Sequence, residues 1–350
     1  MHLEAAHGMT VHEIEQAGFT VAERVDMHVD GDTPQARTLA MAKCMAGMAE
    51  ALQRLNPACV VILGDRYEML AAAAAAAMAG IPIAHIAGGT ISEGAIDNSI
   101  RHAITKLSTL HLVETDEHRH RVIQMGEQPQ SVITAGALGV WNIMHQKLMG
   151  KAELEATLDG FALDRAKTLL VTYHPATLGG EDPVEAFGQL TAALDRFADS
   201  TILITYPNND AGGEALIAAV EKYASSQPGR VKAVRSLGMI RYLSALQNVA
   251  AVVGNSSSGI VEVPSAHIPT VDIGIRQRGR QCAESVIHCA DDADSIAEAI
   301  ALALSPEGQR MAREASNPYF NPDTVNIMAT AITDLAAHKP GPKKFHDIPS

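Results

Sequence analysis

The run GNSSSG at residues 254–259 is the segment whose composition points most directly to a ligand. It follows the apolar run AAVV and opens a helical pattern that contains Glu262. A turn between a parallel strand and a helix presents backbone N–H groups and serine hydroxyls, which bind phosphate oxygens. An ordinary serine cap on a tight turn explains the same residues equally well from the local sequence alone.

A basic loop, GIRQRGR at residues 274–280, follows the next apolar run and places three arginines beside glycines. Guanidinium groups suit a diphosphate because they donate paired hydrogen bonds to phosphate oxygens. A solvated basic loop is the alternative. The formal net charge of −13 argues against a broad nucleic-acid surface, but it is compatible with one local basic pocket.

Acidic side chains follow two apolar runs in the first half of the chain. Asp65 and Arg66 come after the run at 58–63, and Glu93 and Asp97 come after PIAHI and its Gly-Gly turn. Two carboxyl groups at one site suit general acid and base catalysis if burial separates their pKa values. Asp97 is equally well explained as the cap of a helix that begins at Asn98.

Two further polar segments follow apolar runs in the second half. His174 comes after TLLVTY, and the segment YPNND, which contains Asn208, comes after TILIT. The ends of parallel strands are where open α/β sheets present functional groups. For Asn208, an Asx-turn and a ligand contact remain equally open.

Parallel strand–helix–strand units must position these residues, because short runs rich in Val and Ile alternate twice with helical patterns. The predicted strands are 58–63, 82–86, 109–113, 131–135, 168–173, 201–205, 231–234, 250–253, 269–273 and 285–288. Helices are predicted between them, notably at 35–54, 67–79, 184–197, 213–224, 238–247, 258–264 and 293–304, with a final helix at 323–337.

This pattern predicts the α/β class with two Rossmann-like domains. We assign residues 1–150 to the first domain and 151–337 to the second, which includes the final helix, and we expect a disordered tail at 338–350. Doubly wound domains bind ligands at the carboxyl ends of their strands, so a shared ligand is expected in the cleft between the two.

Composition narrows the class of protein further. A chain of 350 residues, 47% of them hydrophobic, can form two cores. No apolar run approaches the roughly 20 residues of a membrane span, and the first residues lack a secretory signal, so we expect a cytoplasmic protein. The four cysteines show no CxxC spacing, and no dinucleotide or HExxH fingerprint is present, so neither a metal nor a cofactor is expected.

Seven segments, in order and spacing, resemble the hydrolysing UDP-N-acetylglucosamine 2-epimerases. They are GDRYEMLAAA (64–73), HIAGG (85–89), EGAIDNSIRHAITK (93–106), VTYHP (171–175), YPNNDAGG (206–213), GNSSSGIVEVPS (254–265) and GIRQRGR (274–280). The resemblance extends from the first residue to about Phe320. It implies a GT-B-like fold and a homodimer that needs no cofactor.

The reaction implied is conversion of UDP-N-acetylglucosamine, or of UDP-2,4-diacetamido-2,4,6-trideoxyglucose, to UDP and the free sugar inverted at C2. Loss of UDP would give a 2-acetamidoglycal, to which water adds. The products, of the N-acetylmannosamine type, are precursors of sialic or legionaminic acids.

The resemblance also implies a role for each candidate residue. Asp65 and Asp97 match the acidic catalytic positions, and His174 matches a histidine that contacts the diphosphate and assists catalysis. The matched substrate-binding positions are Ser256 and Ser257 for the diphosphate, Glu262 for the ribose hydroxyls, and Arg66, Asn208 and Arg276 for further ligand contacts.

The sequence departs from the family pattern at two places. Many relatives carry a glutamate within or just after the Gly-Gly turn, where this chain has Ala87 and Thr90. Either Glu93, the nearest acid, acts in its place or one catalytic contact is missing. Relatives also begin with an additional strand, helix and strand. We therefore expect the first strand-helix-strand of the N-terminal domain to be missing, an exposed sheet edge, and Met1 to be an internal methionine of a longer protein.

Two other functions remain open. A GT-B glycosyltransferase would use the same UDP-sugar but transfer the sugar to an acceptor, although the EGAIDNSIRH segment argues against it. A nucleotide-sugar-binding protein without catalysis would keep the UDP site and release no UDP.

Overall fold

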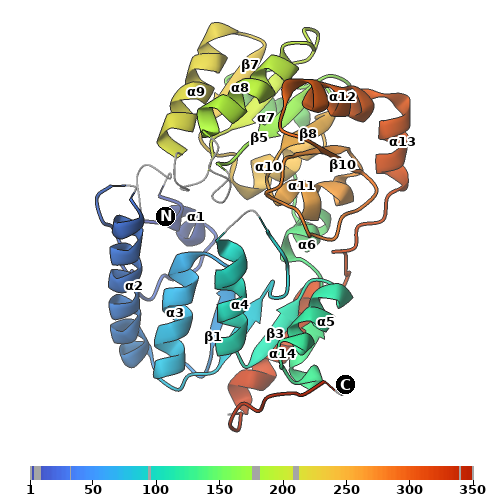
Figure 1. The fold of residues 1–350 in the computed structure, drawn as a ribbon. Coiled ribbons are helices and arrows are strands. Elements are labelled where there is room, and N and C mark those ends of the chain that lie inside the picture. The colour runs from blue at the N-terminus through green and yellow to red at the C-terminus, as the bar shows by residue number, and fades with distance from the viewer. Residues whose placement is uncertain are drawn as a thin grey trace. The chain divides into compact units, whose positions relative to one another are not determined.

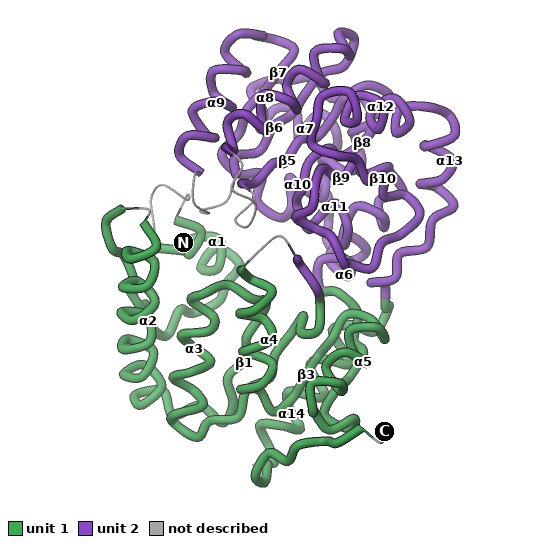
Figure 2. The backbone as a smooth tube through the Cα atoms, viewed as in Figure 1, with its two compact units in different colours: residues 1–90, 96–137, 321–350 green, residues 91–95, 138–320 purple. Residues whose placement is uncertain are grey.

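The computed structural model describes residues 2–3, 9–31, 33–93, 96–175, 182–207, 213–338 and 340–348. The chain forms two compact units, each with its own parallel sheet (Figure 2). Unit 1 comprises residues 1–90, 96–137 and 321–350, and unit 2 comprises residues 91–95 and 138–320. The predicted α/β class with two Rossmann-like domains is confirmed.

The sheet of unit 1 has four parallel strands in the order β1-β2-β3-β4. Helices α2, α3 and α4 lie side by side along it, and α14 contacts β3 (Figure 1). Its elements are α1 (Val11–Gln16), α2 (Pro34–Leu55), β1 (Val60–Leu63), α3 (Tyr67–Met78), β2 (Ile83–Ile86), α4 (Asp97–Leu107), β3 (Leu110–Val113), α5 (Asp116–Gln124), η2 (Pro129–Ser131), β4 (Val132–Thr134) and α14 (Thr324–Ala337).

Small alanine side chains fill the contacts between the helices of unit 1. Helix α3 carries five buried alanines, and α2 and α4 pack on either side of it. Alanine favours helix and lets neighbouring backbones approach closely. Helix α2 begins where Thr33 accepts a hydrogen bond from the Ala36 N–H, with Pro34 at its first position. It ends at Asn56, which has left-handed backbone angles.

Strand β1 lies at an edge of the sheet, and among the described residues it pairs with β2 alone. Its side chains Val61 and Leu63 are 45% and 57% exposed. The exposed edge matches the sequence prediction. Residues 21–30 form no helix or strand and alternate between half-buried and exposed positions, and Val25 lies against Gly47 of α2.

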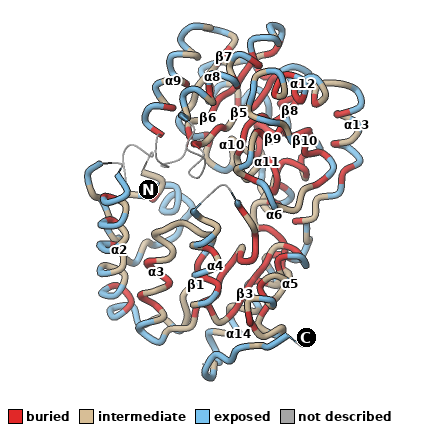
Figure 3. Tube along the Cα trace, in the orientation of Figure 1, coloured by how far each residue is buried: buried red, intermediate tan, exposed pale blue. Residues whose placement is uncertain are grey.

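The sheet of unit 2 has six parallel strands in the order β10-β9-β8-β5-β6-β7. Its central strands are buried along most of their length (Figure 3), as expected for a parallel sheet covered on both faces. Its elements are α6 (Leu138–His145), α7 (Lys151–Ala156), β5 (Leu169–Thr172), α8 (Pro183–Leu194), β6 (Ile202–Thr205), α9 (Gly213–Ser226), β7 (Val231–Val234), α10 (Gly238–Leu246), β8 (Ala251–Gly254), α11 (Ser258–Val261), η3 (Val263–Ala266), β9 (Thr270–Ile273), β10 (Val286–Cys289), α12 (Ala293–Leu304) and α13 (Pro306–Glu314).

The units divide the chain differently from the predicted boundaries. The chain passes from unit 1 to unit 2 after Ala137, not after residue 150. Helices α6 and α7 belong to unit 2 because Ile143 and Leu154 join its core. Helix α14, which the sequence analysis placed in the second domain, belongs to unit 1 and contacts β3.

Residues 340–348, which the sequence places in the expected disordered tail, contact unit 1 in the structure. The Lys343 ammonium donates to the Lys106 and Ser108 carbonyls at the end of α4, each at 2.7 Å. It also lies 2.8 Å from the Glu127 carboxylate. The Phe345 ring covers Gly126, where any side chain would collide with it. The Lys343 contacts are favourable because a cation satisfies helix-terminal carbonyls.

Within the described ranges, no helix is both long enough and apolar enough to cross a membrane.

Candidate functional site

The serine turn, residues 254–258, follows β8 at the carboxyl edge of the unit 2 sheet. Gly254 has φ of +145°, and a Cβ there would collide with the Thr172 carbonyl oxygen of β5. That oxygen accepts the N–H of Asn255 at 3.2 Å. Only glycine allows this close approach of two backbones.

The serines of this turn are half-buried, and Ser257 occupies the cap position of α11 without a side-chain cap hydrogen bond. An ordinary serine cap therefore does not explain Ser257. Helix α11 covers four residues, not the predicted 258–264, because Pro264 has no N–H to continue the helix. A phosphate site here would depend on hydroxyls and turn N–H groups more than on a long helix dipole.

Asn255 joins the serine turn to two other strand-end loops. Its side chain accepts the His174 N–H at 2.7 Å and donates to the His174 carbonyl at 2.8 Å. Its carbonyl accepts from Arg276 at 3.1 Å and from Gln277 at 2.8 Å. The predicted diphosphate ligands His174 and Arg276 are thus brought to the serine turn.

One described contact lies at each end of α11, at Ser258 and at Glu262. The hydroxyl of the partly buried Tyr242 is 2.5 Å from the Ser258 hydroxyl. Burial raises the pKa of Tyr242 above its usual range, so the phenol stays protonated. The Glu262 side chain lies directly over Gly139 of α6, where a Cβ would collide with its carboxylate. Glu262 is half-buried and therefore accessible to a ligand.

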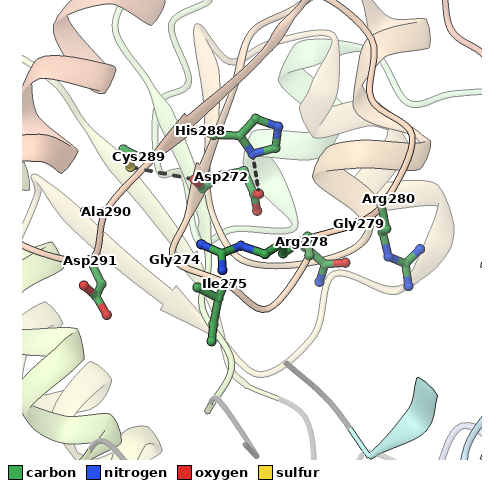
Figure 4. Close-up of a pocket in the computed structure, with 11 residues that line it drawn as sticks. Asp272, Gly274, Ile275, Arg278, Gly279, Arg280, His288, Cys289, Ala290 and Asp291 are labelled. Carbon is green, nitrogen blue, oxygen red and sulfur yellow. Dashed lines mark hydrogen bonds and ion pairs between the residues drawn. The ribbon is translucent and has the colours of Figure 1, made fainter. Parts of the chain in front are cut away.

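A pocket of about 530 Å³ opens at the ends of β9 and β10 (Figure 4). Its histidine, His288, lies 2.9 Å from the buried Asp272 carboxylate. This hydrogen bond raises the pKa of His288 to about 10, so the imidazole is cationic at neutral pH. Arg276 does not line the pocket. The lining residues are Asp272, Gly274, Ile275, Gln277, Arg278, Gly279, Arg280, His288, Cys289, Ala290 and Asp291.

In unit 1, Asp65 follows β1 and pairs with Arg101 of α4. The Arg101 side chain is 2% exposed and also donates to the Thr90 carbonyl at 2.7 Å. The imidazole of His85 is 2.9 Å from the Gly64 carbonyl, next to Asp65. Burial lowers the pKa of His85 to about 4, so it is neutral and can donate this hydrogen bond. The turn that presents Asp65 is therefore held from both sides.

Arg66 lies at the start of α3 with its side chain a quarter exposed. Its guanidinium donates to the Glu68 carboxylate at 3.0 Å and lies 5.8 Å from the centre of the Tyr67 ring. A ligand phosphate or sugar would compete with Glu68 for this arginine.

The two acids of the EGAIDNSIRH segment, Glu93 and Asp97, belong to different compact units. Helix α4 begins at Asp97 itself, and the residue in the N-cap position is Ile96, which makes no side-chain cap hydrogen bond. The alternative prediction, that Asp97 is the N-cap of a helix beginning at Asn98, therefore does not hold. Glu93 belongs to unit 2, where its N–H points to the Arg278 carbonyl at 3.4 Å, whereas Asp97 belongs to unit 1. Asn208 lies outside the described residues.

Glu114, which follows β3, is not among the residues predicted from the sequence. Its carboxylate lies 3.4 Å from the Thr90 hydroxyl and 3.8 Å from the His118 ring, and its side chain is 12% exposed. Since Thr90 also contacts Arg101, a chain of contacts through Thr90 and Arg101 connects Glu114 to Asp65 at the carboxyl edge of one sheet. Applying the strand-end criterion to the run 109–113 would have selected Glu114.

Among the described residues, no group of three or more His, Cys, Asp or Glu side chains gathers as metal ligands would.

Comparison with known proteins gives a consistent result. Residues 1–333 match the family described as UDP-N-acetylglucosamine 2-epimerase. The polysialic acid biosynthesis protein P7 of Escherichia coli is 33% identical over all of this chain and 88% of its own length. The GDP/UDP-N,N'-diacetylbacillosamine 2-epimerase (hydrolyzing) of Campylobacter jejuni is 34% identical over 82% of this chain and 74% of its own length.

The solved structure of Neisseria meningitidis UDP-GlcNAc 2-epimerase bound to UDP-GlcNAc superposes with a TM-score of 0.74. The match covers 87% of this chain and 84% of that one at 17% identity, so it establishes the GT-B-like fold alone.

Proposed function

The chain belongs to the UDP-N-acetylglucosamine 2-epimerase family, and from this premise we propose that it is a hydrolysing UDP-HexNAc 2-epimerase. The main support for binding of the UDP moiety is the assembly of the serine turn, His174 and Arg276 around Asn255. The hydrolysing part is supported by the Campylobacter relative, whose name states that activity.

The proposed reaction has two steps. A carboxylate removes the C2 proton while the C1–O bond breaks and its electrons leave with the diphosphate, which gives UDP and a 2-acetamidoglycal. Water then adds at C1, and C2 receives a proton on the opposite face. The free sugar differs from the substrate at C2. General base catalysis and stabilisation of the leaving diphosphate are the two requirements.

Unit 2 meets the second requirement in this proposal. Ser256, Ser257 and Arg276 hold the diphosphate, Glu262 accepts hydrogen bonds from the ribose, and His174 contacts the phosphates. Arg66 and Asn208 are proposed as further ligand contacts. Charge-assisted hydrogen bonds to phosphate strengthen as the leaving group gains charge, which lowers the barrier to elimination.

Unit 1 meets the first requirement. Asp65 and Asp97 are the proposed acid and base, and Asp65 pairs with the buried Arg101 guanidinium, which fixes the position of its carboxylate. We keep Glu93 as the proposed third acid. Glu114 is the alternative candidate for this role, because contacts through Thr90 and Arg101 connect it to Asp65.

The substrate is proposed to be UDP-N-acetylglucosamine or UDP-2,4-diacetamido-2,4,6-trideoxyglucose, with a product of the sialic or legionaminic acid pathways. The test is incubation of the purified protein with each sugar nucleotide and no acceptor. Release of UDP together with a C2-inverted free sugar supports the proposal. A UDP-linked epimer would indicate the non-hydrolysing reaction.

The same assay separates the remaining functions. A glycosyltransferase would consume the sugar nucleotide only when an acceptor sugar is added. A binding protein would be stabilised by UDP and release none. We also propose a cytoplasmic homodimer, which light scattering of the purified protein and fractionation of native cells would test.

A further inference from the structure

We propose that Asn255 is a positioning residue of the nucleotide site, which holds the loops after β5, β8 and β9 in one fixed arrangement. This inference rests on the proposed function for its activity assay, but not for its structural test.

The side chain of Asn255 acts like an additional pair of sheet hydrogen bonds. The residue is 2% exposed. Its Oδ1 accepts the His174 N–H at 2.7 Å, and its Nδ2 donates to the carbonyl of the same residue at 2.8 Å. Because one partner is a donor and the other an acceptor, only the amide satisfies both. The His174 backbone therefore has one position relative to the serine turn.

The backbone carbonyl of Asn255 makes the second link. It accepts from Arg276 at 3.1 Å and from the buried Gln277 at 2.8 Å. The loop after β9 is therefore tied to the residue that holds the loop after β5. Neither link involves a serine hydroxyl, so both leave the serines for a ligand.

The turn itself cannot shift to compensate for a lost link. Gly254 lies against the Thr172 carbonyl, which accepts the Asn255 N–H. When the three loops are already in place, binding a diphosphate costs less conformational entropy than when binding must first order the loops. Asn255 therefore acts on ligand affinity without touching the ligand.

The principal variants are Asn255→Ala, which removes both side-chain links, and Asn255→Asp, which keeps the acceptor for the His174 N–H but replaces the donor. Asn248→Ala is the matched control. Asn248 also donates from its side chain to a backbone carbonyl in unit 2, that of Ser244 at 2.9 Å, but lies outside the site.

We expect Asn255→Ala to weaken UDP binding by about tenfold and to raise KM more than it lowers kcat. Asn255→Asp should lie between Ala and the wild type, and Asn248→Ala should bind UDP normally. An Asn255→Ala protein that folds and binds UDP as the wild type does would overturn the proposal. If Asn255→Ala does not fold, Gln277→Leu, which removes one link to the carbonyl, should weaken UDP binding by a smaller factor.

Amide hydrogen exchange tests the inference without any ligand. Faster exchange in Asn255→Ala at residues 171–175, 254–260 and 274–280 together is expected, with no such change in Asn248→Ala. Faster exchange confined to the serine turn would show that the loops are not linked through Asn255. If the wild type neither binds UDP nor turns over a sugar nucleotide, the proposed function fails, and the exchange result still decides the role of Asn255.

Discussion

Asp65 shows how a strand-end carboxylate depends on residues far away in the sequence. Its partner Arg101 is 36 residues away, almost fully buried, and bound to the Thr90 carbonyl. Removing one partner of such a pair leaves an uncompensated charge in a desolvated place. The position of the Asp65 carboxylate is thus a property of the folded unit, and substitutions nearby should change catalysis more than ligand binding.

Asp97→Asn is the direct test of the proposed acid and base pair. Asparagine keeps the shape of the side chain but cannot accept or deliver the C2 proton. We expect kcat to fall by about a hundredfold or more while the UDP affinity remains near that of the wild type. Steady-state kinetics and calorimetric titration with UDP measure both. A variant with normal kcat would remove Asp97 from the mechanism.

Glu93→Gln and Glu114→Gln, made in parallel, identify the third acid. If Glu93 acts, its variant should lose turnover and one limb of the pH–rate profile, while the Glu114 variant keeps both. The reverse result would assign the role to Glu114, which the described contacts connect to Asp65. Two variants with wild-type profiles would contradict any third acid.

At the scale of elements, the serine turn keeps its position because β8, at Gly254, approaches β5 more closely than any side chain would permit. Gly254→Ala should therefore push the turn away from Thr172, reduce UDP binding by about tenfold or more and destabilise unit 2 by about 1–3 kcal/mol. Thermal unfolding with and without UDP measures both effects.

Gly150→Ala is the control for this substitution. Gly150 precedes α7, and nothing lies within 4 Å of the position that a Cβ would occupy. This variant should match the wild type in stability and in UDP binding. A Gly254→Ala protein that behaved in the same way would show that the close approach of β8 to β5 is dispensable.

At the scale of the whole molecule, the C-terminal tail returns to unit 1 and completes a buried ionic cluster. Burial opposes the charge of Glu127, but hydrogen bonds from His111, Lys106 and Lys343 lower the pKa of its carboxyl to about 2. Its ordinary value is 4.5. The cluster therefore contributes stability above about pH 4.5, and this contribution is lost as the pH falls toward 2.

Glu127→Gln tests this pH dependence. Glutamine does not titrate, so the variant should be less stable than the wild type at neutral pH and lose less stability on acidification. The difference corresponds to about 3 kcal/mol over the full interval. Urea unfolding followed by circular dichroism at about pH 6, pH 5 and pH 4 measures it. Parallel curves for the two proteins would refute the assignment.

The sequence by itself determined the ten strands, most of the helices and the strand-end positions of Asp65, His174 and the serine turn. These features are local, because periodicity and turn chemistry act within a few residues. The resemblance carried by seven segments identified the family, which the family match confirmed.

Only the tertiary structure decided which of these residues meet. It assigned Glu93 and Asp97 to different compact units, although they are only four positions apart in the sequence. It brought Asn255 to His174, 81 residues away, and returned α14 and the tail to unit 1. Such pairings depend on how distant elements pack, and no local propensity encodes them, so the acids and the serine turn were foreseen while the residues that hold them were not.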